Sequence, residues 1–315
     1  MARSQPGWDE RIGRRLKLRD LHVLAEVVKC GSMAKAASHL AMSQPAVSEA
    51  IASLERAVGV RLLDRHAQGV GPTPYADVLI SRMRTVFDEL RQGIREIEFL
   101  SNPKVGEVRV ACPEFVAAGL LPKAIGTFLE KYPGVTFHVV NKDTTNLQNQ
   151  ELHDRVVDLV LSRVPSGFQD DDFNVDTLFD DPHWIIAGVT SPWARMRKIS
   201  LEDLCDAPWI LPPSPVIFNL LNSAFDARGS RLSKVSITSA SLLLRSELLA
   251  TGRFISVMHA SILVKNAKAW GLKRLNVDVE LRSPPIALMT LKKRTPSPVV
   301  QRFIDHLRSI AAARR

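Results

Sequence analysis

A pair of closely spaced helical segments near the start of the chain constrains its fold most. Residues 29–60 read KCGSMAKAASHLAMSQPAVSEAIASLERAVGV. Ser32 and Ser43 each precede apolar residues at helical spacing, where a serine side chain accepts a hydrogen bond from a first-turn amide. Pro45 fits a first turn because that amide has no acceptor within the helix. The pattern predicts a short helix, a turn of about three residues and a longer second helix.

The second helix of this pair has an apolar face and a polar face. The apolar stripe consists of Val47, Ile51, Leu54 and Val58, and the opposite face carries Gln44, Pro45, Ser48, Glu49, Ala52 and Arg56. A thin helix pair with a polar outer face is typical of a helix-turn-helix that enters the DNA major groove, and an ordinary helical hairpin is the alternative. Gln44 can make paired hydrogen bonds to adenine, and Ser48 can contact a base or a phosphate.

A turn-rich segment and a long helix follow. Residues 61–79, RLLDRHAQGVGPTPYADVL, predict a tight hairpin, or wing, before a helix start. From Pro74 to about Leu100 there is no further proline, and the apolar spacing is that of a heptad seam. The seam residues are Leu79, Met83, Val86, Leu90 and Ile97. This length favours a self-association helix, although a surface helix of a monomer would carry a similar stripe.

The pattern changes near residue 104 to alternating strands and helices. The predicted strands are EVRVAC, VTFHVV and VDLVLS in a first lobe and HWIIAGV, WILPPS, KVSITSA and RFISVM in a second, followed by PIALMTL and a helix in SPVVQRFIDHLRSI. This order predicts a two-lobed α/β domain with mostly parallel sheets. The expected fold is an all-α winged helix-turn-helix and a long linker helix, followed by the α/β domain.

The charge and hydropathy of the chain favour a nucleic-acid partner. A net charge of +9 over 315 residues favours a polyanion. The longest apolar run, FVAAGLL, is seven residues, so we expect no transmembrane helix and no membrane partner. The first 20 residues contain no apolar run of a secretory signal, which predicts a cytoplasmic protein.

Cysteine and histidine spacing argues against a metal site. The three cysteines, Cys30, Cys112 and Cys205, lie far apart, and none of the eight histidines pairs with a His, Cys or carboxylate at a metal-ligand spacing. Phosphate-loop, hydrolase and zinc-protease signatures are missing from the sequence. We therefore expect no metal, no cofactor and no catalytic residues. A solute-binding protein or an enzyme built on the α/β lobes is the alternative function class.

Several motifs resemble the LysR-type transcriptional regulators. AASHL, SQPAVS, I..LE...GV.LL.R and PT stand at the spacing of that family's winged helix-turn-helix, and LLPKAIGTFLEKYPGV with VDLVLSR resembles its effector domain. A fainter likeness, in ATGRFISVM and LKKRTPSPVVQRFIDHLR, is to the subgroup associated with sugar-related gene control.

The resemblance implies a sequence-specific transcriptional regulator that responds to a small-molecule effector bound between two lobes like those of periplasmic binding proteins. It implies double-stranded promoter DNA and a second copy of the chain, as dimer or tetramer, as partners, with RNA polymerase as a further candidate. The expected domains are 1–73 for DNA binding, 74–103 for the linker (dimerisation) helix and 104–315 for effector binding. Within the last, lobe 1 spans about 104–181 and 282–315, and lobe 2 spans about 182–281.

The expected DNA contacts come from the helix pair and the wing. They are Ser32, Met33, Lys35, Ser43, Gln44, Pro45, Ser48, Glu49, Arg56, Arg65 and Thr73. Two residues depart from the family pattern. Glu49 stands where many members have a basic residue, so a phosphate contact is not expected at this position. Glu49 could instead accept a hydrogen bond from cytosine N4, or it could repel the DNA backbone. Pro74 replaces a small residue after the threonine of the wing.

The expected effector contacts lie at the carboxyl ends of strands, against helix N-termini. They are Cys112, Pro113, Glu114, Thr144, Thr145, Ser162, Ser214, Pro215 and Ser239. Helix capping by Thr145, Ser214 and Ser239 is the competing interpretation, and a redox role is the alternative for Cys112. Glu114 at a helix start would repel an acidic ligand, which predicts an uncharged, hydroxyl-rich effector or one that presents a donor to Glu114.

Overall fold

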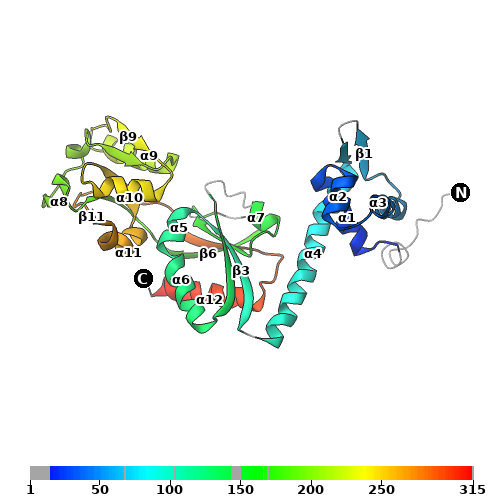
Figure 1. Cartoon of the computed structure of the whole chain (residues 1–315). Helices are drawn as coiled ribbons and strands as arrows, with labels where there is room; N and C mark the ends of the chain where they lie inside the picture. The colour runs from blue at the N-terminus through cyan, green and yellow to red at the C-terminus, as the bar shows by residue number, and fades with distance from the viewer. Residues whose placement is uncertain are drawn as a thin grey trace. The chain divides into compact units, whose positions relative to one another are not determined.

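The structure is a computed structural model that describes residues 15–66, 69–102, 104–142, 150–165, 167–168 and 170–313. The chain divides into two compact units, residues 1–94 and 95–315, and the division falls inside one long helix (Figure 1). Among the described helices, none has both the length and the apolar composition that crossing a bilayer requires.

The first unit is built on three helices, α1 (Leu18–Cys30), α2 (Met33–His39) and α3 (Gln44–Val58). The Ser32 hydroxyl accepts from the Lys35 amide at 3.4 Å, and the Ser43 hydroxyl accepts from the Ala46 amide at 3.3 Å, so both predicted caps are present. The apolar stripe of α3 is buried against α1 and α2, which leaves the first turn of α3 facing outward.

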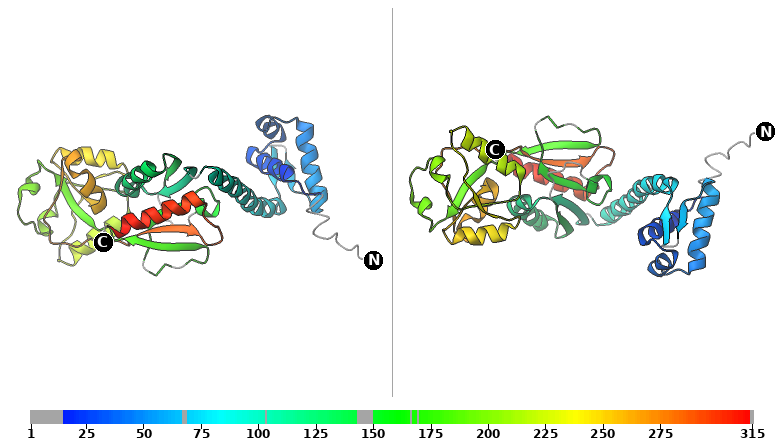
Figure 2. Two further views of the ribbon diagram at one scale, coloured as in Figure 1. Left: turned by 90° about the horizontal axis from the view of Figure 1, so that it is seen from below. Right: turned by 90° about the horizontal axis from the view of Figure 1, so that it is seen from above.

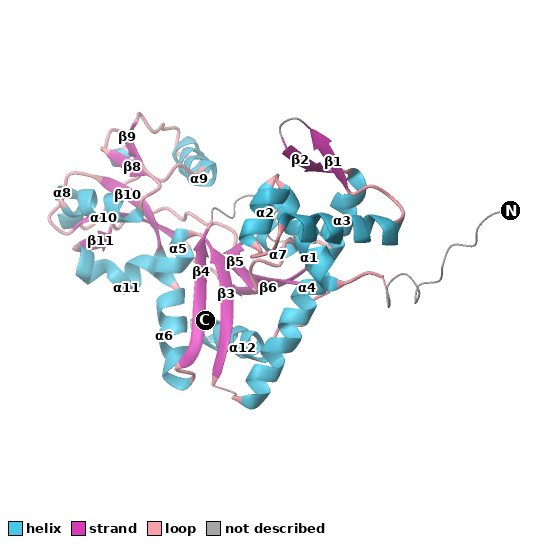
Figure 3. Cartoon of the chain, turned by 45° about the vertical axis from the view of Figure 1, so that its right-hand side comes forward, coloured by secondary structure: helices cyan, strands magenta, loops and turns pink. Residues whose placement is uncertain are grey.

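The wing is a hairpin of β1 (Leu63–His66) and β2 (Gly69–Pro72), paired antiparallel (Figure 3). The Val70 amide donates to the carbonyl oxygen of Gly31 at 3.0 Å. A Cβ added at Gly69 would lie 2.6 Å from that same oxygen, and the φ of Gly69 is +140°. Only glycine therefore lets the wing sit so close to the turn between α1 and α2.

The long helix α4 (Pro74–Ser101) begins after the wing. Leu79 packs against the core of the first unit, and Met83 is buried in it. The later seam residues Val86, Leu90 and Ile97 are 44%, 46% and 65% exposed. The predicted seam thus has two parts, of which the first completes the core and the second presents an apolar stripe that is largely exposed among the described residues.

The first lobe of the second unit contains a five-stranded sheet in the order β4-β3-β5-β12-β6. Its strands are β3 (Val105–Cys112), β4 (Gly134–Asn141), β5 (Leu159–Arg163), β6 (Phe173–Phe179) and β12 (Ile286–Leu291), and its helices are α5 (Glu114–Gly119), α6 (Leu121–Lys131), α7 (Gln150–His153) and α12 (Pro298–Ala312). Helices α6 and α12 bury their apolar faces against one side of this sheet (Figure 2).

The second lobe has a sheet of the same size in the order β11-β7-β10-β8-β9. Its strands are β7 (His183–Gly188), β8 (Trp209–Leu211), β9 (Val235–Thr238), β10 (Ile255–His259) and β11 (Leu272–Arg274), and its helices are α8 (Pro192–Arg195), the 3-10 turn η2 (Glu202–Leu204), α9 (Pro215–Asp226), α10 (Leu242–Ala250) and α11 (Ala260–Trp270). Helix α9 covers one face, and α10 and α11 cover the other.

Both sheets are mixed, so the prediction of mostly parallel sheets was wrong. In the first lobe β3 is parallel to β4 and β5, but β12 runs antiparallel to both β5 and β6. Parallel neighbours usually need a crossover helix between them. Strand β12 instead returns directly from the other lobe, and β7 correspondingly enters the second sheet directly from β6.

Replacing Leu90 with Asp should weaken self-association. A charge placed in an apolar helix contact would be buried without a partner. We expect light scattering of the full-length protein to show smaller species for Leu90→Asp at micromolar concentration. Ser81→Asp, which lies on the side of α4 opposite the seam, is the control and should keep the wild-type mass. An unchanged mass for Leu90→Asp would contradict the role of the exposed stripe.

Candidate nucleic-acid interface and inter-lobe site

The first turn of α3 exposes the predicted DNA-reading side chains. Gln44, Pro45 and Glu49 are exposed and Ser48 is half-buried, whereas Val47 between them is fully buried. The remaining predicted contacts in this region are also accessible, with Lys35 and Ser43 exposed and Ser32 and Met33 half-buried. The helix-turn-helix therefore presents polar side chains on the face that a major groove would meet.

The acidic residue of α3 is paired with a basic one on the same helix. Arg56 donates to the Glu49 carboxylate at 2.5 Å. Both side chains are about two-thirds exposed, at 67% and 69%, so water screens the pair and its net contribution to stability is small. The ion pair can therefore break at little cost in free energy if either side chain contacts a base or a phosphate of DNA.

Thr73, another of the expected DNA contacts, is largely buried and hydrogen-bonded within the protein. It is 7% exposed, and its hydroxyl donates to the Arg61 carbonyl at 2.9 Å and accepts from the Ala76 amide at 3.4 Å. It thereby joins the end of the wing to the start of α4. The side chain of Arg65 lies outside the described residues.

Two segments link the lobes of the second unit, and one arginine joins them. Arg163 ends β5, and its Nη2 donates to the carbonyl oxygen of Asp181 at 2.5 Å. Its Nη1 donates to the carbonyl oxygen of Pro284. Asp181 lies between β6 and β7, and Pro284 lies just before β12, so a single guanidinium holds both linking segments.

Two histidines complete this buried cluster. His259 Nδ1 accepts from Arg163 at 2.8 Å, and the imidazole stacks on Phe115 with ring centroids 4.0 Å apart. His183 lies beside it with ring centroids 4.3 Å apart, and its Nδ1 is 2.9 Å from the Ser283 hydroxyl. The buried Nε2 of His183 has no hydrogen-bond partner among the described residues.

Burial sets the charge of the cluster. It lowers the pKa of His183 to about 3, with the positive charge of Arg163 acting in the same direction, and it lowers the pKa of His259 well below the ordinary value. It also lowers the pKa of Arg163 to about 10, against the opposing charges of Asp181 and Asp180. At neutral pH the arginine is therefore a cation and both imidazoles are neutral.

Two carboxylates meet the N-termini of second-lobe helices. Both oxygens of Glu114, in α5, lie 3.3 Å from the Leu242 amide at the start of α10. Asp181 accepts from the amide and the hydroxyl of Ser261 at the start of α11, both at 2.8 Å. Negative charge is favoured at these positions by the helix dipole and the free first-turn amides.

Glu114 therefore caps α10 of the opposite lobe and not its own helix. The sequence placed it correctly at the start of α5, but the tertiary fold turns its carboxylate across the junction. Arg245, one turn into α10, is 8% exposed, and its Nε has no partner among the described residues. Burial lowers the pKa of Arg245, while the charge of Glu114 opposes that shift.

Three of the expected effector contacts are buried in the protein. Cys112 is 0% exposed in the first-lobe core, Ser162 is 2% exposed, and Pro113 is buried as well. Burial raises the pKa of the Cys112 thiol to about 12, which keeps it protonated and unreactive. The expectation of ligand contact at Cys112 and its redox alternative both lose support.

The hydroxyl residues of the second lobe remain accessible. The Ser239 hydroxyl accepts from the Ser241 amide at 3.2 Å, next to the amide that Glu114 caps. Ser214 precedes α9 without a side-chain capping bond and is half-buried, and Pro215 is exposed. Thr144 and Thr145 lie outside the described residues.

The sequence did not single out the charged residues of this junction. Arg163, His183 and Arg245 are far apart in the chain. The sequence gives a functional signal only for Arg163, which stands at the end of the predicted strand VDLVLSR. His259 packs against Phe115.

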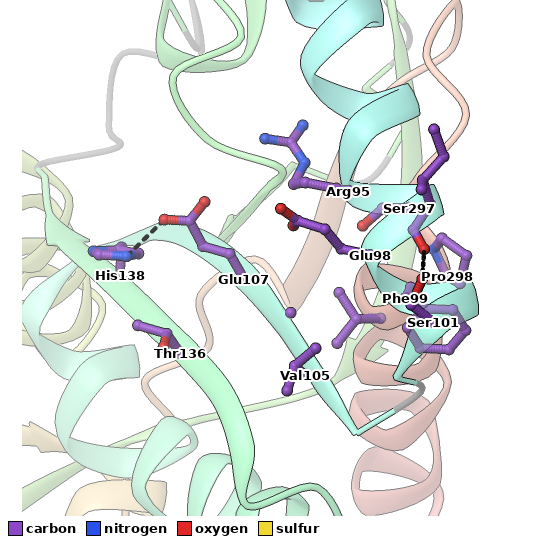
Figure 4. Close-up of a pocket in the computed structure, with 13 residues that line it drawn as sticks. Arg95, Glu98, Phe99, Ser101, Val105, Glu107, Thr136, His138, Ser297 and Pro298 are labelled. Atoms are coloured by element: carbon purple, nitrogen blue, oxygen red, sulfur yellow. Dashed lines mark hydrogen bonds and ion pairs between the residues drawn. The ribbon is translucent and has the colours of Figure 1, made fainter.

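An open groove of about 590 Å³ lies elsewhere in this unit, at the amino ends of β3 and β4 (Figure 4). The end of α4 and the start of α12 form its other wall, and Glu107 pairs with His138 across its floor at 2.7 Å. Ligands of parallel α/β sheets bind at the carboxyl ends of strands, so this groove does not match the expected effector site.

His183 should make the second unit sensitive to acid. Below pH 6.5 the unfolded chain binds a proton at this histidine, whereas the folded chain does not until about pH 3. The free energy of unfolding should therefore fall as the pH decreases, by about 1.4 kcal/mol per pH unit from this group. His183→Gln should reduce the slope of stability against pH by about that amount between roughly pH 6 and 4.5. Denaturant unfolding of the full-length protein measures the slope, and His153→Gln, an exposed histidine of the same unit, should leave it unchanged.

Comparison with known proteins matches both units. Residues 101–312 match the LysR substrate binding domain, and residues 18–77 match the bacterial regulatory helix-turn-helix protein, lysR family. The transcriptional regulator GbpR of Azospirillum brasilense is 25% identical over 297 residues, which cover 94% of this chain and 86% of that protein. TdcA of Escherichia coli K12 is 27% identical over 62% of each chain.

Solved structures share the fold over most of the chain. CbnR, a LysR family regulator solved in complex with its target DNA, aligns with a TM-score of 0.64 and 20% identity over 93% of this chain and 99% of its own. Full-length BenM aligns with a TM-score of 0.53 and 22% identity over 95% of this chain and 98% of its own. With both of its domains matched, this chain belongs to the LysR-type family of DNA-binding transcriptional regulators, which are not enzymes.

Proposed function

We propose that this protein binds promoter DNA as a homo-oligomer in the cytoplasm and that a small molecule bound at the inter-lobe junction alters its control of RNA polymerase. The DNA contacts come from the first two turns of α3, and the subunits associate through the exposed stripe of α4. The proposal of an effector at this junction rests on the contact between the Glu114 carboxylate and the N-terminus of α10. Because this contact between the lobes is polar, a ligand with hydrogen-bonding groups can replace it.

Base reading is assigned to Gln44 and Ser48. Both lie in the first two turns of a helix that the buried side chains of Val47 and Ile51 fix in the core. A glutamine can bond both N6 and N7 of adenine in the major groove. Glu49 accepts from cytosine N4 after releasing Arg56, which then becomes available for a phosphate. Exchange of this one exposed ion pair for two DNA contacts costs little because the pair is screened by water.

The effector is assigned to the region between Glu114 and the hydroxyls of Ser214 and Ser239. The N-termini of α10 and α11 already hold carboxylates, and Arg245 faces the charge of Glu114. A second anion at these positions would be repelled. An uncharged ligand with several hydroxyl groups, such as a sugar derivative, fits this environment because it can donate to Glu114 and accept from the serines.

The double change Gln44→Ala with Ser48→Ala should remove specific DNA binding. Loss of one good bidentate base contact costs roughly 1 to 3 kcal/mol, or about 5- to 150-fold in affinity. Fluorescence anisotropy with the DNA upstream of the protein's own coding region measures this loss, and an unrelated duplex of equal length gives the non-specific affinity, which should change little. Ser81→Ala in α4 is the control. Equal loss on both duplexes would assign these residues to backbone contact and contradict the proposal.

Glu114→Gln should weaken the response to the effector and leave operator binding intact. Its neutral amide still offers an acceptor but loses the charge-assisted bond, so binding of a hydroxyl-rich ligand should fall by at least about tenfold. Calorimetric titration of the full-length protein with sugars and with aromatic and dicarboxylic acids tests this. Glu247→Gln, an exposed residue of α10, is the matched control. Tight binding of a dicarboxylate to wild type and to Glu114→Gln alike would show that the effector site is assigned wrongly.

A further inference from the structure

Three potential metal ligands converge beside the helix-turn-helix. Glu26 and Cys30 lie one turn apart on α1, and His39 is the last residue of α2. Glu26 Oε1 is 2.6 Å from His39 Nδ1 and 3.7 Å from Cys30 Sγ, and all three ligand atoms lie within 4.8 Å of one another. No other group of three such side chains meets this criterion among the described residues. Sequence spacing missed the cluster because His39 joins it only through the packing of α2 on α1.

The donor set suits a borderline divalent ion. Thiolate, imidazole and carboxylate together are ligands that zinc accepts, and three protein ligands with a water in the fourth position form a common tetrahedral arrangement. Metal–ligand bonds of about 2.0–2.3 Å place neighbouring ligand atoms roughly 3.3–3.8 Å apart. The Glu26 to Cys30 distance of 3.7 Å already fits this range. His39 Nδ1 must withdraw from Glu26 by about 0.7 Å to reach it.

The surroundings permit this small adjustment. The His39 side chain is 62% exposed and can rotate, whereas Glu26 is held with only 11% of its side chain exposed. Lys29 is the competing cation, with Nζ 3.2 Å from the same carboxylate oxygen. Its side chain is 69% exposed, so it can move into water when a divalent ion takes its place.

We propose that Glu26, Cys30 and His39 bind one Zn²⁺-class ion that ties the end of α1 to the end of α2. Cys30 directly precedes Gly31, whose carbonyl oxygen anchors the wing through the Val70 amide at 3.0 Å. His39 directly precedes the turn into α3. The ion therefore stabilises the part of the fold that fixes both the wing and the recognition helix.

Cobalt(II) is the probe for this site, because a thiolate-bound tetrahedral Co²⁺ ion absorbs strongly and Zn²⁺ then displaces it. We expect the reduced, metal-free, full-length protein to bind one equivalent, with a thiolate-to-cobalt charge-transfer band. Cys30→Ser should lose that band, and His39→Ala should weaken binding by more than about 100-fold, beyond the effect of losing an outer-shell partner. Cys205→Ser, which alters a half-buried cysteine of the other unit, is the control and should keep both the charge-transfer band and the wild-type affinity for cobalt.

Thermal unfolding provides a second measurement that does not depend on the cobalt spectrum. A ligand that binds only the folded state raises the unfolding temperature, so Zn²⁺ should raise it for the wild type and for Cys205→Ser but not for Cys30→Ser. Thermal unfolding without metal shows whether each variant is folded. The proposal is overturned if the wild type shows no thiolate band, or if the band and the Zn²⁺ shift persist in Cys30→Ser.

Discussion

The arrangement of the effector-binding unit depends on one largely buried cation. Arg163 donates to the carbonyl oxygens of Asp181 and Pro284, one in each segment that links the lobes, and to His259 of the second lobe. A buried charge without such partners would be strongly destabilising, so the linking segments and the guanidinium fix one another. Any change in how the lobes are arranged must either preserve these bonds or replace them.

The second lobe is also held by contacts with helix α5 of the first lobe. Helix α5 of the first lobe contributes Glu114 to the start of α10, and its Gly119 approaches the start of α11 so closely that an added Cβ would lie 2.5 Å from the Ser261 hydroxyl. The Leu242 amide donates to the Glu114 carboxylate at 3.3 Å, a longer distance than the 2.8 Å at which the Ser261 amide donates to Asp181. The junction thus combines short hydrogen bonds at Arg163 and Asp181 with longer ones at Glu114, the residue to which the proposed effector contact is assigned.

Local pattern predicted the elements of the DNA-binding unit well. The caps at Ser32 and Ser43, the buried stripe of α3 and the wing all depend on residues near one another in the chain. Strands β6 and β11 were missed, since FNVDTLF follows a run of acids and LKR is only three residues long. The direction of β12 was also missed, because strand pairing is set by how the chain returns from the other lobe and not by the hydropathy of the strand.

By itself the sequence determined the helices and the wing of the DNA-binding unit, the likeness to the family and the outward face of α3, because helix periodicity and capping act over a few residues. Only the tertiary structure decided what the charged side chains do. Glu114 reaches a helix 128 residues away, Arg163 joins segments that follow it by 18 and 121 residues, and His39 meets Glu26 across 13. The same holds for Cys112 and Thr73, which look like site residues in sequence but are buried. Long-range hydrogen bonds, and the burial of residues at the ends of elements, arise from packing between elements that are distant in the chain, and a local pattern does not encode them.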